Sequence, residues 1–595
     1  MRSTFAGLNT MVRGIFSNQL SLDTTGHNIT NASTEGYSRQ SVNLAATRGQ
    51  NVSSIYGEVI VGTGVDSTSI LRARNVYADK QYWTETAQKN YYTTQQTNYD
   101  KVEAIFDDSK NTGLKNAMTE FYNAWNDLST NASTSSNRIA VIEKGNVVAD
   151  RIKTTAQQLQ SQINSQYEDM TLNVAKINDY TKELTKLNQN IMQTEASGGK
   201  ANDLRDQRDL IVDKLSEYMN LNIYEDDKGM YSVVSNGITM VNGNSRLTLE
   251  MSDAIASEKY GISDYTVNIK ESGIAFVPTN GSMKAQMDTI AEDKGYIDQL
   301  ANISATFLTT FNTMHQQGAG IDGTDGSLGT DDGSDTYAGP SYGRNFWGDD
   351  DTVYVWDNEN QAIVATKLKN ITRSLGTSTM NGETVPQVQI TGTQDSQENL
   401  DGINIINALA VNTELKATGG QNLIAARKLV VEAETDSNGA YTGNNVVKVN
   451  GSGDGTNATN LSTIINMDES NVHSTSNVTY TIGGTVAMDI SGTSSGVPNN
   501  MTSRAINSDS INAYYSATVA KLGSDSESVD DKSDAQDKLI TQITNWRSST
   551  SGVDWNEELS NMIMFQQGYS ACSRCLTTMD EMLDRLINST GMVGR

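Results

Sequence analysis

The sequence predicts a multidomain α+β protein in which helical segments at both ends of the chain enclose a β-rich middle. Three observations support this prediction. Apolar residues recur with helical spacing near both termini. The prolines lie in the middle, where β loops accept them and long helices would not; they are Pro278, Pro340, Pro386 and Pro498. The length of 595 residues is too great for a single hydrophobic core.

A stripe near the N-terminus predicts a helix that needs a partner. Its members follow alternating steps of three and four residues, the spacing of a coiled-coil seam. They are Phe5, Leu8, Val12, Ile15, Gln19, Leu22, Gly26 and Ile29. Because an isolated helix of this length is marginal in water, we expect it to pack on another helix.

The C-terminus carries a second stripe with the same stepping. Its members are Met562, Phe565, Tyr569, Cys572, Leu576, Met579, Leu583 and Leu586. Fully burying such side chains contributes roughly 1.5–3 kcal/mol each, so we predict that the two ends pair through these seams. Since periodicity does not distinguish an assembly helix from a core helix, two amphipathic core helices of one domain are the alternative.

A specific turn follows the first helix. Its characteristic residues are Asn28, Ile29, Asn31, Thr34, Gly36, Tyr37 and Arg39. Asn31 and Thr34 can bond their own backbone and Gly36 permits a positive φ, so the helix should stop near Asn31. Tyr37 and Arg39 would offer an aromatic face and a bidentate donor to a neighbouring surface. An ordinary loop tyrosine and a solvated arginine are the alternative.

These seven residues match the run N-I-x-N-x-x-T-x-G-[FY]-x-R. The turn therefore resembles the signature of the axial proteins of the bacterial flagellum, the rod, hook and hook-associated family. A second segment, Asn202 to Asp209 with the sequence N-D-L-R-D-Q-R-D, resembles a feature of hook-associated members. The resemblance covers about residues 1–320 and 505–595.

The resemblance implies a structural function and a set of partners. Copies would form a ring that joins hook to filament by self-assembly through the paired terminal helices, in contact with hook protein and a second junction protein. It also implies export to the extracellular flagellum through the flagellum's type III channel without a cleaved signal peptide. An export chaperone is expected on the C-terminal helix.

Composition restricts the other partners. The net charge of −27 and the pI near 4.5 disfavour binding to nucleic acid or to anionic membranes. No stretch approaches the roughly 20 apolar residues that cross a bilayer, and the N-terminus lacks the pattern of a secretory signal. Composition alone would indicate a cytoplasmic protein, and the family resemblance changes that prediction.

The residues that could carry chemistry form no recognisable constellation. The pair Cys572 and Cys575 has the spacing of a redox or zinc half-site, but Cys572 lies on the apolar seam, which favours a packed thiol. The histidines are scattered, at 27, 315 and 473. We therefore expect no cofactor, no metal and no enzyme activity. Asp203, Asp206 and Asp209 alternate with arginines and are interpreted as a solvated ion-pair face.

The periodicities also predict a division of the chain. Residues 1–60 hold the N-terminal coil helix, signature and linker; 61–220 the first part of a long-helix domain; 221–282 a β-rich excursion; 283–317 a returning helix; 318–505 β-rich outer domains with a variable insertion; 506–550 returning helices; and 551–595 the C-terminal coil helix. Heptad spacing from Ile163 to Ile191 predicts a rod-like helix of roughly 45 Å or more. The Asp-Gly runs of residues 322–333 miss the spacing of a calcium loop and indicate a solvated loop.

Three rival functions stay open at this stage. Another axial subunit, such as hook or rod protein, would share the turn signature. A glycan-acting enzyme would need paired carboxylates in the middle region, where Asp349, Asp350 and Asp351 lie beside Trp347 and Trp356. An adhesin would expose the middle region to a surface.

Overall fold

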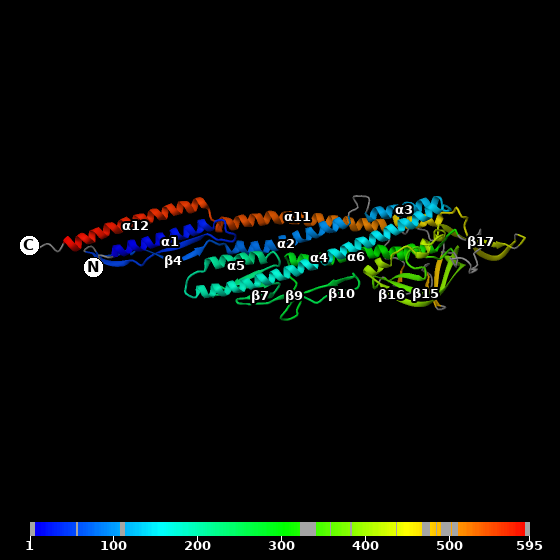
Figure 1. Cartoon of the computed structure of the whole chain (residues 1–595), viewed down its shortest axis with the longest axis horizontal. Helices are drawn as coiled ribbons and strands as arrows, with labels where there is room; N and C mark the ends of the chain where they lie inside the picture. Colours follow the sequence, from blue (N-terminus) through cyan, green and yellow to red (C-terminus); the bar gives the residue numbers. More distant parts are fainter. Residues whose placement is uncertain are drawn as a thin grey trace, which may run out of the picture.

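The computed structural model shows an elongated molecule with the terminal helices at one end and the largest β-sheet at the other (Figure 1). It describes residues 6–54, 57–106, 113–321, 341–357, 359–380, 383–435, 437–438, 440–466, 477–482, 485–489, 501–502 and 510–589. The predicted Asp-Gly loop at 322–333 lies outside the described residues. The chain travels along the long axis, passes through the β-rich region and returns, so α1 begins and α12 ends at the same end (Figure 1).

The narrow end consists of two helices and two β-ribbons. Helix α1 (Ala6–Asn31) lies beside α12 (Trp555–Ser589), and the two pack on each other. Strand β1 (Gln40–Ala46) pairs antiparallel with β4 (Val65–Arg72), and β2 (Gln50–Ser54) pairs with β3 (Gly57–Val61). The first ribbon packs on α1, so α1 has a partner on two sides.

Long helices build the centre of the molecule. They are α2 (Val76–Ile105), α3 (Leu114–Thr130), α4 (Ser135–Glu195), α5 (Asn202–Leu215), α6 (Ser282–Thr306) and α11 (Ile511–Ser551). At 61 residues, α4 is about 90 Å long at 1.5 Å per residue. The heptad run predicted only its second half; residues 149–162 contain neither proline nor glycine, so nothing interrupts the helix.

The excursion between α5 and α6 is a set of short antiparallel strands. Its strands are β5 (Asn222–Glu225), β6 (Tyr231–Ser235), β7 (Ile238–Asn242), β8 (Ser245–Arg246), β9 (Leu249–Met251), β10 (Ile255–Ser257), β11 (Ile262–Asp264) and β12 (Val267–Ile269). Strands β5 to β8 form one meander, while β9 pairs with β12 and β10 with β11. The predicted Asn-Gly turn joins β6 to β7, with Asn236 and Gly237 both at positive φ.

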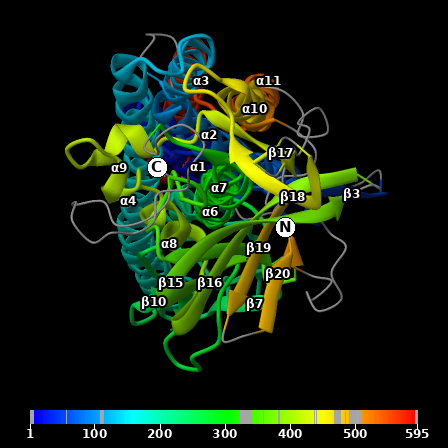
Figure 2. The same cartoon turned by 90° about the vertical axis from the view of Figure 1, so that its right-hand side faces the viewer.

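The outer region contains a six-stranded sheet in the order β20-β19-β16-β15-β14-β21 (Figure 2). Its strands are β14 (Thr352–Asp357), β15 (Ala362–Met380), β16 (Glu383–Leu400), β19 (Asn477–Ile482), β20 (Thr485–Asp489) and β21 (Met501–Thr502). Strands β16 and β19 are parallel, and the other neighbours are antiparallel.

Short elements connect this sheet to the helices. Helix α6 continues through the π-helix η1 (Phe307–Phe311) and α7 (Asn312–Gln316). A second sheet follows the order β13-β17-β18, with β13 (Gly318–Ala319), β17 (Arg427–Thr435) and β18 (Tyr441–Val449). The intervening helices are α8 (Gly402–Ala408), α9 (Thr413–Lys416), the 3-10 helix η2 (Gly420–Leu423) and α10 (Thr456–Asn466).

One hydrophobic core crosses the predicted boundary at residue 318. At its centre lies an aromatic cluster of buried rings, Phe121, Trp125, Phe307, Phe311, Phe346 and Trp347. Because Phe346 and Trp347 come from the middle of the sequence, that part of the outer region is packed into the helical domain. A second, smaller core lies within the β-sheets. The division of the chain into domains stays a prediction.

Buried His315 belongs to the same junction of helix and sheet. Its Nδ1 donates to the carbonyl of Arg344 at 2.8 Å, and its Nε2 accepts the Ala425 N–H at 3.0 Å. Burial lowers the pKa of His315 to about 4, so the ring is neutral at physiological pH. In the described part of the chain, no helix has an apolar stretch long enough to cross a bilayer.

Truncating the centre of the aromatic cluster should weaken the helical domain. We expect Phe121→Ala to lower the free energy of unfolding by about 3–5 kcal/mol, because it leaves a cavity among rings that contact Phe121 on several sides. The matched control is Phe16→Ala, at a side chain that is 65% exposed, with an expected change within about 0.5 kcal/mol. Urea denaturation followed by tryptophan fluorescence measures both, and equal losses would contradict the packing described.

Candidate functional site: the terminal coil and its joint

Helices α1 and α12 form an antiparallel pair, which we call the terminal coil. A Cβ built on Gly14 would lie 2.9 Å from Cys572 Sγ, and one built on Gly7 would lie 3.0 Å from Met579 Cε. Asn18 likewise approaches Gly568, and Asn28 bonds to Glu558. Each step of seven residues along α1 is thus matched by a step of seven back along α12, which is a coiled-coil register.

The seam by which α1 meets α12 consists of small and polar residues, one position away from the predicted apolar seam. The buried residues of α1 are Ser17, Ser21, Thr24, Thr25 and Asn28. The predicted seam residues Leu8, Val12, Ile15 and Leu22 are only half-buried, and Gln19 is exposed. The predicted pairing of the two ends is correct, but the predicted α1 contact face is wrong. Glycine and serine allow the closest approach of the two backbones, so they line the contact.

Another face of α1 contacts the β-ribbon segments at Thr63, Asp66 and Ser67. Thr10 Oγ1 and Ser17 Oγ face the first ribbon, at Thr63 and Ser67, and Arg13 forms a bidentate ion pair with Asp66 at 2.7 and 2.8 Å. The half-buried apolar seam lies about 100° from the side that packs on α12, on the side away from the ribbon. It therefore remains available as a further packing surface.

On α12 the predicted seam is the less exposed side of the helix. Met562, Phe565, Cys572, Leu576, Met579 and Leu583 are half-buried, while Tyr569 is 38% exposed. Phe5 and the side chain of Leu586 lie outside the described residues. The opposite side of α12 carries exposed apolar residues, among them Ile563, Met564 and Met582. The terminal coil thus presents apolar surface that its own chain does not cover.

The turn after α1 is closed by the side chain of Asn28, which is only 2% exposed. Its Nδ2 donates to the carbonyl of Gln40 at 2.8 Å and to Glu558 Oε2 at 3.1 Å. Its Oδ1 accepts the Gln40 N–H at 2.9 Å and the Tyr37 hydroxyl at 2.7 Å. One amide thereby ties the end of α1, the outgoing strand and α12 together.

Arg39 completes this connection from the other side of the turn. Its Nε donates to Glu558 Oε1 and its Nη2 to Glu557 Oε1, both at 2.6 Å. Its backbone N–H donates to the carbonyl of Ser551, the last residue of α11. Tyr37 and Arg39 therefore bond within the chain, where Arg39 donates to two carboxylates of α12, and their part in assembly stays a prediction.

The remaining signature residues shape the turn. Helix α1 ends at Asn31, as predicted, where Asn31 Nδ2 donates to the His27 carbonyl and Thr34 Oγ1 donates to Asn31 Oδ1. Gly36 has φ +79°, and a Cβ there would lie 3.1 Å from Leu210 of α5, so both backbone and space favour glycine. Ile29 is half-buried.

Below this turn, a cluster of buried ion pairs, which we call the joint, connects the ribbon to the helical domain. Arg72 of β4 contacts Asp206 Oδ1 at 2.7 Å and Asp209 Oδ2 at 2.9 Å. Arg74 pairs with Asp79 at 2.9 Å and lies 3.6 Å from Asp209. The Ser38 N–H also donates to Asp206. The joint thus ties both strands of the ribbon, at the end where Gln40 pairs with Arg72, to α5.

Helix α11 enters the joint through Arg547. Its guanidinium contacts Asp79 of α2 and Asp213 of α5, each at 2.9 Å. Trp83 Nε1 donates to the other oxygen of Asp213 at 2.6 Å. The joint therefore links α2, α5 and α11 at the point where the terminal coil begins.

Asp206 and Asp209 are not solvated, contrary to the sequence interpretation, whereas Asp203 is exposed as that interpretation expects. Asp206, Asp209 and Arg205 are buried. Arg205 bonds to Glu195 and Glu225 rather than to Asp209 one turn on. Arg72 lies more than 130 residues before Asp206 and Asp209, and the partners of Arg205 lie on the preceding helix α4 and on β5, so helical spacing within α5 did not reveal them.

The pKa values reflect a balance of burial and nearby charge. Burial opposes ionisation of Asp209, but Arg74 and Arg72 outweigh it and lower its pKa. At Asp206 and Asp213, burial raises the pKa despite the adjacent arginines. Burial and the neighbouring carboxylates raise the pKa of Tyr37, so its hydroxyl stays a donor.

Known proteins resemble this chain over its whole length. The family model described as flagellar hook-associated protein FlgK helical domain matches residues 99–329, and that described as flagellar basal body rod FlgEFG protein C-terminal matches residues 547–589. Flagellar hook-associated protein 1 of Bacillus subtilis is 25% identical over 625 residues, covering 100% of both chains. That of Salmonella typhimurium is 25% identical, covering 98% of this chain and 99% of its own.

The chain thus carries the FlgK helical domain and is similar to flagellar hook-associated protein 1 along its whole length. The solved structure of the flagellar hook junction protein FlgK from Burkholderia pseudomallei shares the fold, with a TM-score of 0.51, 16% identity and coverage of 79% of this chain and 100% of that one. The predicted α+β architecture and family are thus confirmed. The chain is a structural component of the extracellular flagellum, and these matches support a role at the hook–filament junction.

The acidic residues considered for a glycan-acting enzyme form ion pairs within the chain. Asp350 pairs with Arg344 at 2.9 Å and with Arg373 at 2.6 Å, and Asp351 pairs with Lys367. Trp347 and Trp356 are buried in the core. Asp350 is therefore committed to two cations and faces no substrate surface.

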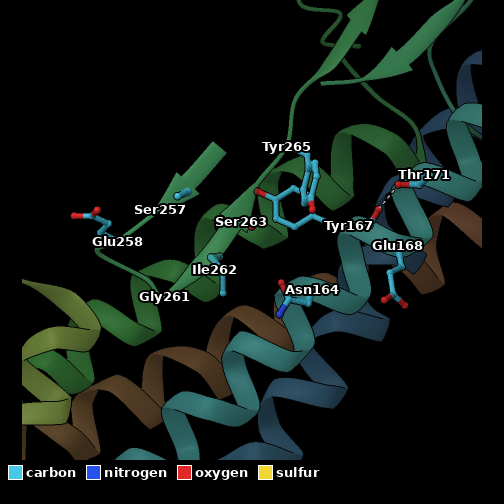
Figure 3. A pocket seen from close by; sticks show the side chains of 11 residues that line it. Asn164, Tyr167, Glu168, Thr171, Ser257, Glu258, Gly261, Ile262, Ser263 and Tyr265 are labelled. Atoms are coloured by element: carbon cyan, nitrogen blue, oxygen red, sulfur yellow. Dashed lines mark hydrogen bonds between the residues drawn. The ribbon is translucent and has the colours of Figure 1, made fainter. Parts of the chain in front are cut away.

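A cleft with a volume of about 750 Å³ lies between α4 and the ribbon β10–β11. Tyr167 and Tyr265 meet edge to face in it, with ring centroids 5.2 Å apart. Figure 3 shows the carboxylates of Glu168 and Glu258 on opposite sides of the cleft, pointing away from each other. They do not converge as an acid–base pair would. Among the described residues, histidine, cysteine and carboxylate side chains form no cluster of metal ligands.

Removing Glu558 should loosen the terminal coil far more than removing its neighbour. Glu558 is 2% exposed and bonds to both Asn28 and Arg39, whereas Glu557 is 55% exposed. We expect Glu558→Ala to cost on the order of 3 kcal/mol, because it leaves partners of a buried pair unpaired. Glu557→Ala should cost under about 1 kcal/mol. Amide exchange of residues 28–40 measures both, and a similar loss of protection would refute the assigned roles.

Proposed function

We propose that copies of this chain form a ring at the distal end of the hook, and that the terminal coil of each copy supplies the contacts between copies. The observation that carries this proposal is the uncovered apolar surface of the coil. Leu8, Val12 and Ile15 are half-buried, and Ile563 and Met564 are more than half exposed. A group of exposed apolar side chains on one helix pair is typical of an interaction site.

The two seams of α1 explain how self-assembly and intramolecular pairing coexist. The small-residue seam holds α12 of the same chain at short distance. The apolar seam, about 100° further round the helix, then faces the outer side of α12 of another copy, which presents Ile563 and Met582. Each coil would thus use both of its apolar faces in a closed ring.

The further partners follow from the position of the coil in the flagellum. We propose that the ring contacts hook protein on one side and a second junction protein on the other. Before assembly, the exposed apolar residues of α12 need a cover, and an export chaperone on this helix would provide it. We propose that the chain leaves the cell through the flagellum's own type III export channel.

The experiment is capping of isolated hooks, observed by electron microscopy. We expect the full chain to cap hooks, and the chain without residues 1–40 and 556–595 to fail while its helical domain stays folded by circular dichroism. Capping by the truncated chain would refute the role of the coil. Failure of the full chain to bind hooks would refute the junction role proposed for it and favour another axial position.

A charge on the outer face of α12 should block assembly without disturbing the coil. Ile563 is 56% exposed, so Ile563→Asp loses little within the chain but would place an unpaired carboxylate in the proposed interface. We expect at least a tenfold lower occupancy of hooks. Ile563→Met keeps the apolar surface and serves as the matched control, with near-native occupancy. Normal capping by Ile563→Asp would show that this face stays free.

A further inference from the structure

A buried polar layer crosses the helical domain far from the terminal coil. Asn98 comes from α2, Gln162 and Gln166 from α4, and Thr289 and Asp293 from α6. The Asp293 side chain is fully buried, with an exposed fraction of 0%. A carboxylate in such a place needs either a cation or a proton.

The neighbours of Asp293 in this layer are neutral. Asn98 Nδ2 donates to Asp293 Oδ1 at 2.9 Å, and Gln166 Nε2 donates to Oδ2 at 2.6 Å. Thr289 Oγ1 in turn donates to Gln166 Oε1 at 2.6 Å. Both amides donate to the carboxylate oxygens and so favour the ionised form, but two neutral donors do not replace the hydration that full burial removes, so burial still favours the protonated acid.

The charged groups around the layer do not offset the cost of burying an ionised Asp293. Glu292 precedes it on α6 and accepts the Tyr99 hydroxyl of α2 at 2.9 Å. Burial is the main cause that raises the pKa of Asp293 to about 7, and the charge of Glu292 adds to it. The hydrogen bonds from Asn98 and Gln166 and the positive charge of Lys101 of α2 lower the pKa of Asp293, opposite to the effect of Glu292. The negative charge of Asp525 of α11 in turn raises the pKa of Glu292.

A cavity connects the layer with solvent. It has a volume of about 310 Å³ and is lined by Asn98, Gln162, Gln166 and Thr289 together with the charged side chains Lys101, Asp169 and Lys176. Lys101 and Asp169 are exposed. Water and protons therefore reach the buried side chains without unfolding of the domain.

We propose that this layer makes the helical domain respond to pH, with α6 packed firmly on α2 and α4 while Asp293 is protonated and more loosely once it ionises. The folded state retains a proton that the unfolded chain loses near pH 4. Stability therefore falls as the pH rises from about 4 to 7 and is level above that range. Because the flagellum lies outside the cell, the layer experiences the pH of the medium. The inference does not depend on the assembly proposed above.

Amide exchange of α6 in the full chain tests this proposal. In the native chain, the protection of residues 282–306, corrected for the intrinsic exchange rate, should fall by up to tenfold per pH unit between about pH 5 and 7. In Asp293→Asn it should stay constant over this range and exceed the native value at pH 8. Asp169→Asn, at the exposed rim of the same cavity, is the matched control and should keep the native pH dependence.

Two results would overturn the proposal. One is an equal pH dependence in the native chain and in Asp293→Asn. The other is a native chain in which residues 282–306 and the outer strand β16 lose protection in parallel, which would indicate a general effect of pH. The second comparison needs no variant, so it decides the matter even if Asp293→Asn does not fold.

Discussion

The architecture of the narrow end depends on the hydrogen bonds that converge on Asn28. This amide joins the end of α1, the backbone of Gln40 and the carboxylate of Glu558. Arg39 binds the same carboxylate. Asn28 and Glu558 are 530 residues apart in the sequence, so these bonds connect the two ends of the chain directly. The joint below transmits this position to α2, α5 and α11 through buried ion pairs.

This arrangement gives the two parts of the molecule different physical characters. The helical domain has a continuous core with fully buried aromatic rings. The described part of the terminal coil has polar residues in its buried positions and leaves its larger apolar residues half-covered. Burial of polar groups fixes geometry at little gain in stability, so the coil is specified by hydrogen bonds and completed by what packs on it. A subunit that must first exist alone and then assemble fits this division.

The sequence predicted the elements better than their contacts. Heptad spacing located both terminal helices, and the turn signature located the end of α1 at Asn31. The heptad pattern did not show which of two adjacent seams faces α12, because periodicity favours the seam with large apolar residues. The contact is instead made by small and polar residues, Gly7, Gly14, Ser21 and Asn28. Their spacing of seven was the signal for a close helix contact. The partners of Asp206 and Asp209 could not be predicted from α5 alone, since Arg72 and Arg74 reach them only through the fold.

The close approach of Gly14 to Cys572 offers the most direct measurement of the central claim, that α1 pairs with α12 of its own chain through the small-residue seam. A Cβ at position 14 would lie 3.9 Å from the Cβ of Cys572, a distance suited to a disulfide. In a chain with Cys575→Ser, we predict that Gly14→Cys forms an intramolecular disulfide under mild oxidation, seen as a faster monomer band on a non-reducing gel. Formation of disulfide-linked dimers instead, or of no bond, would contradict the pairing on which this account is built.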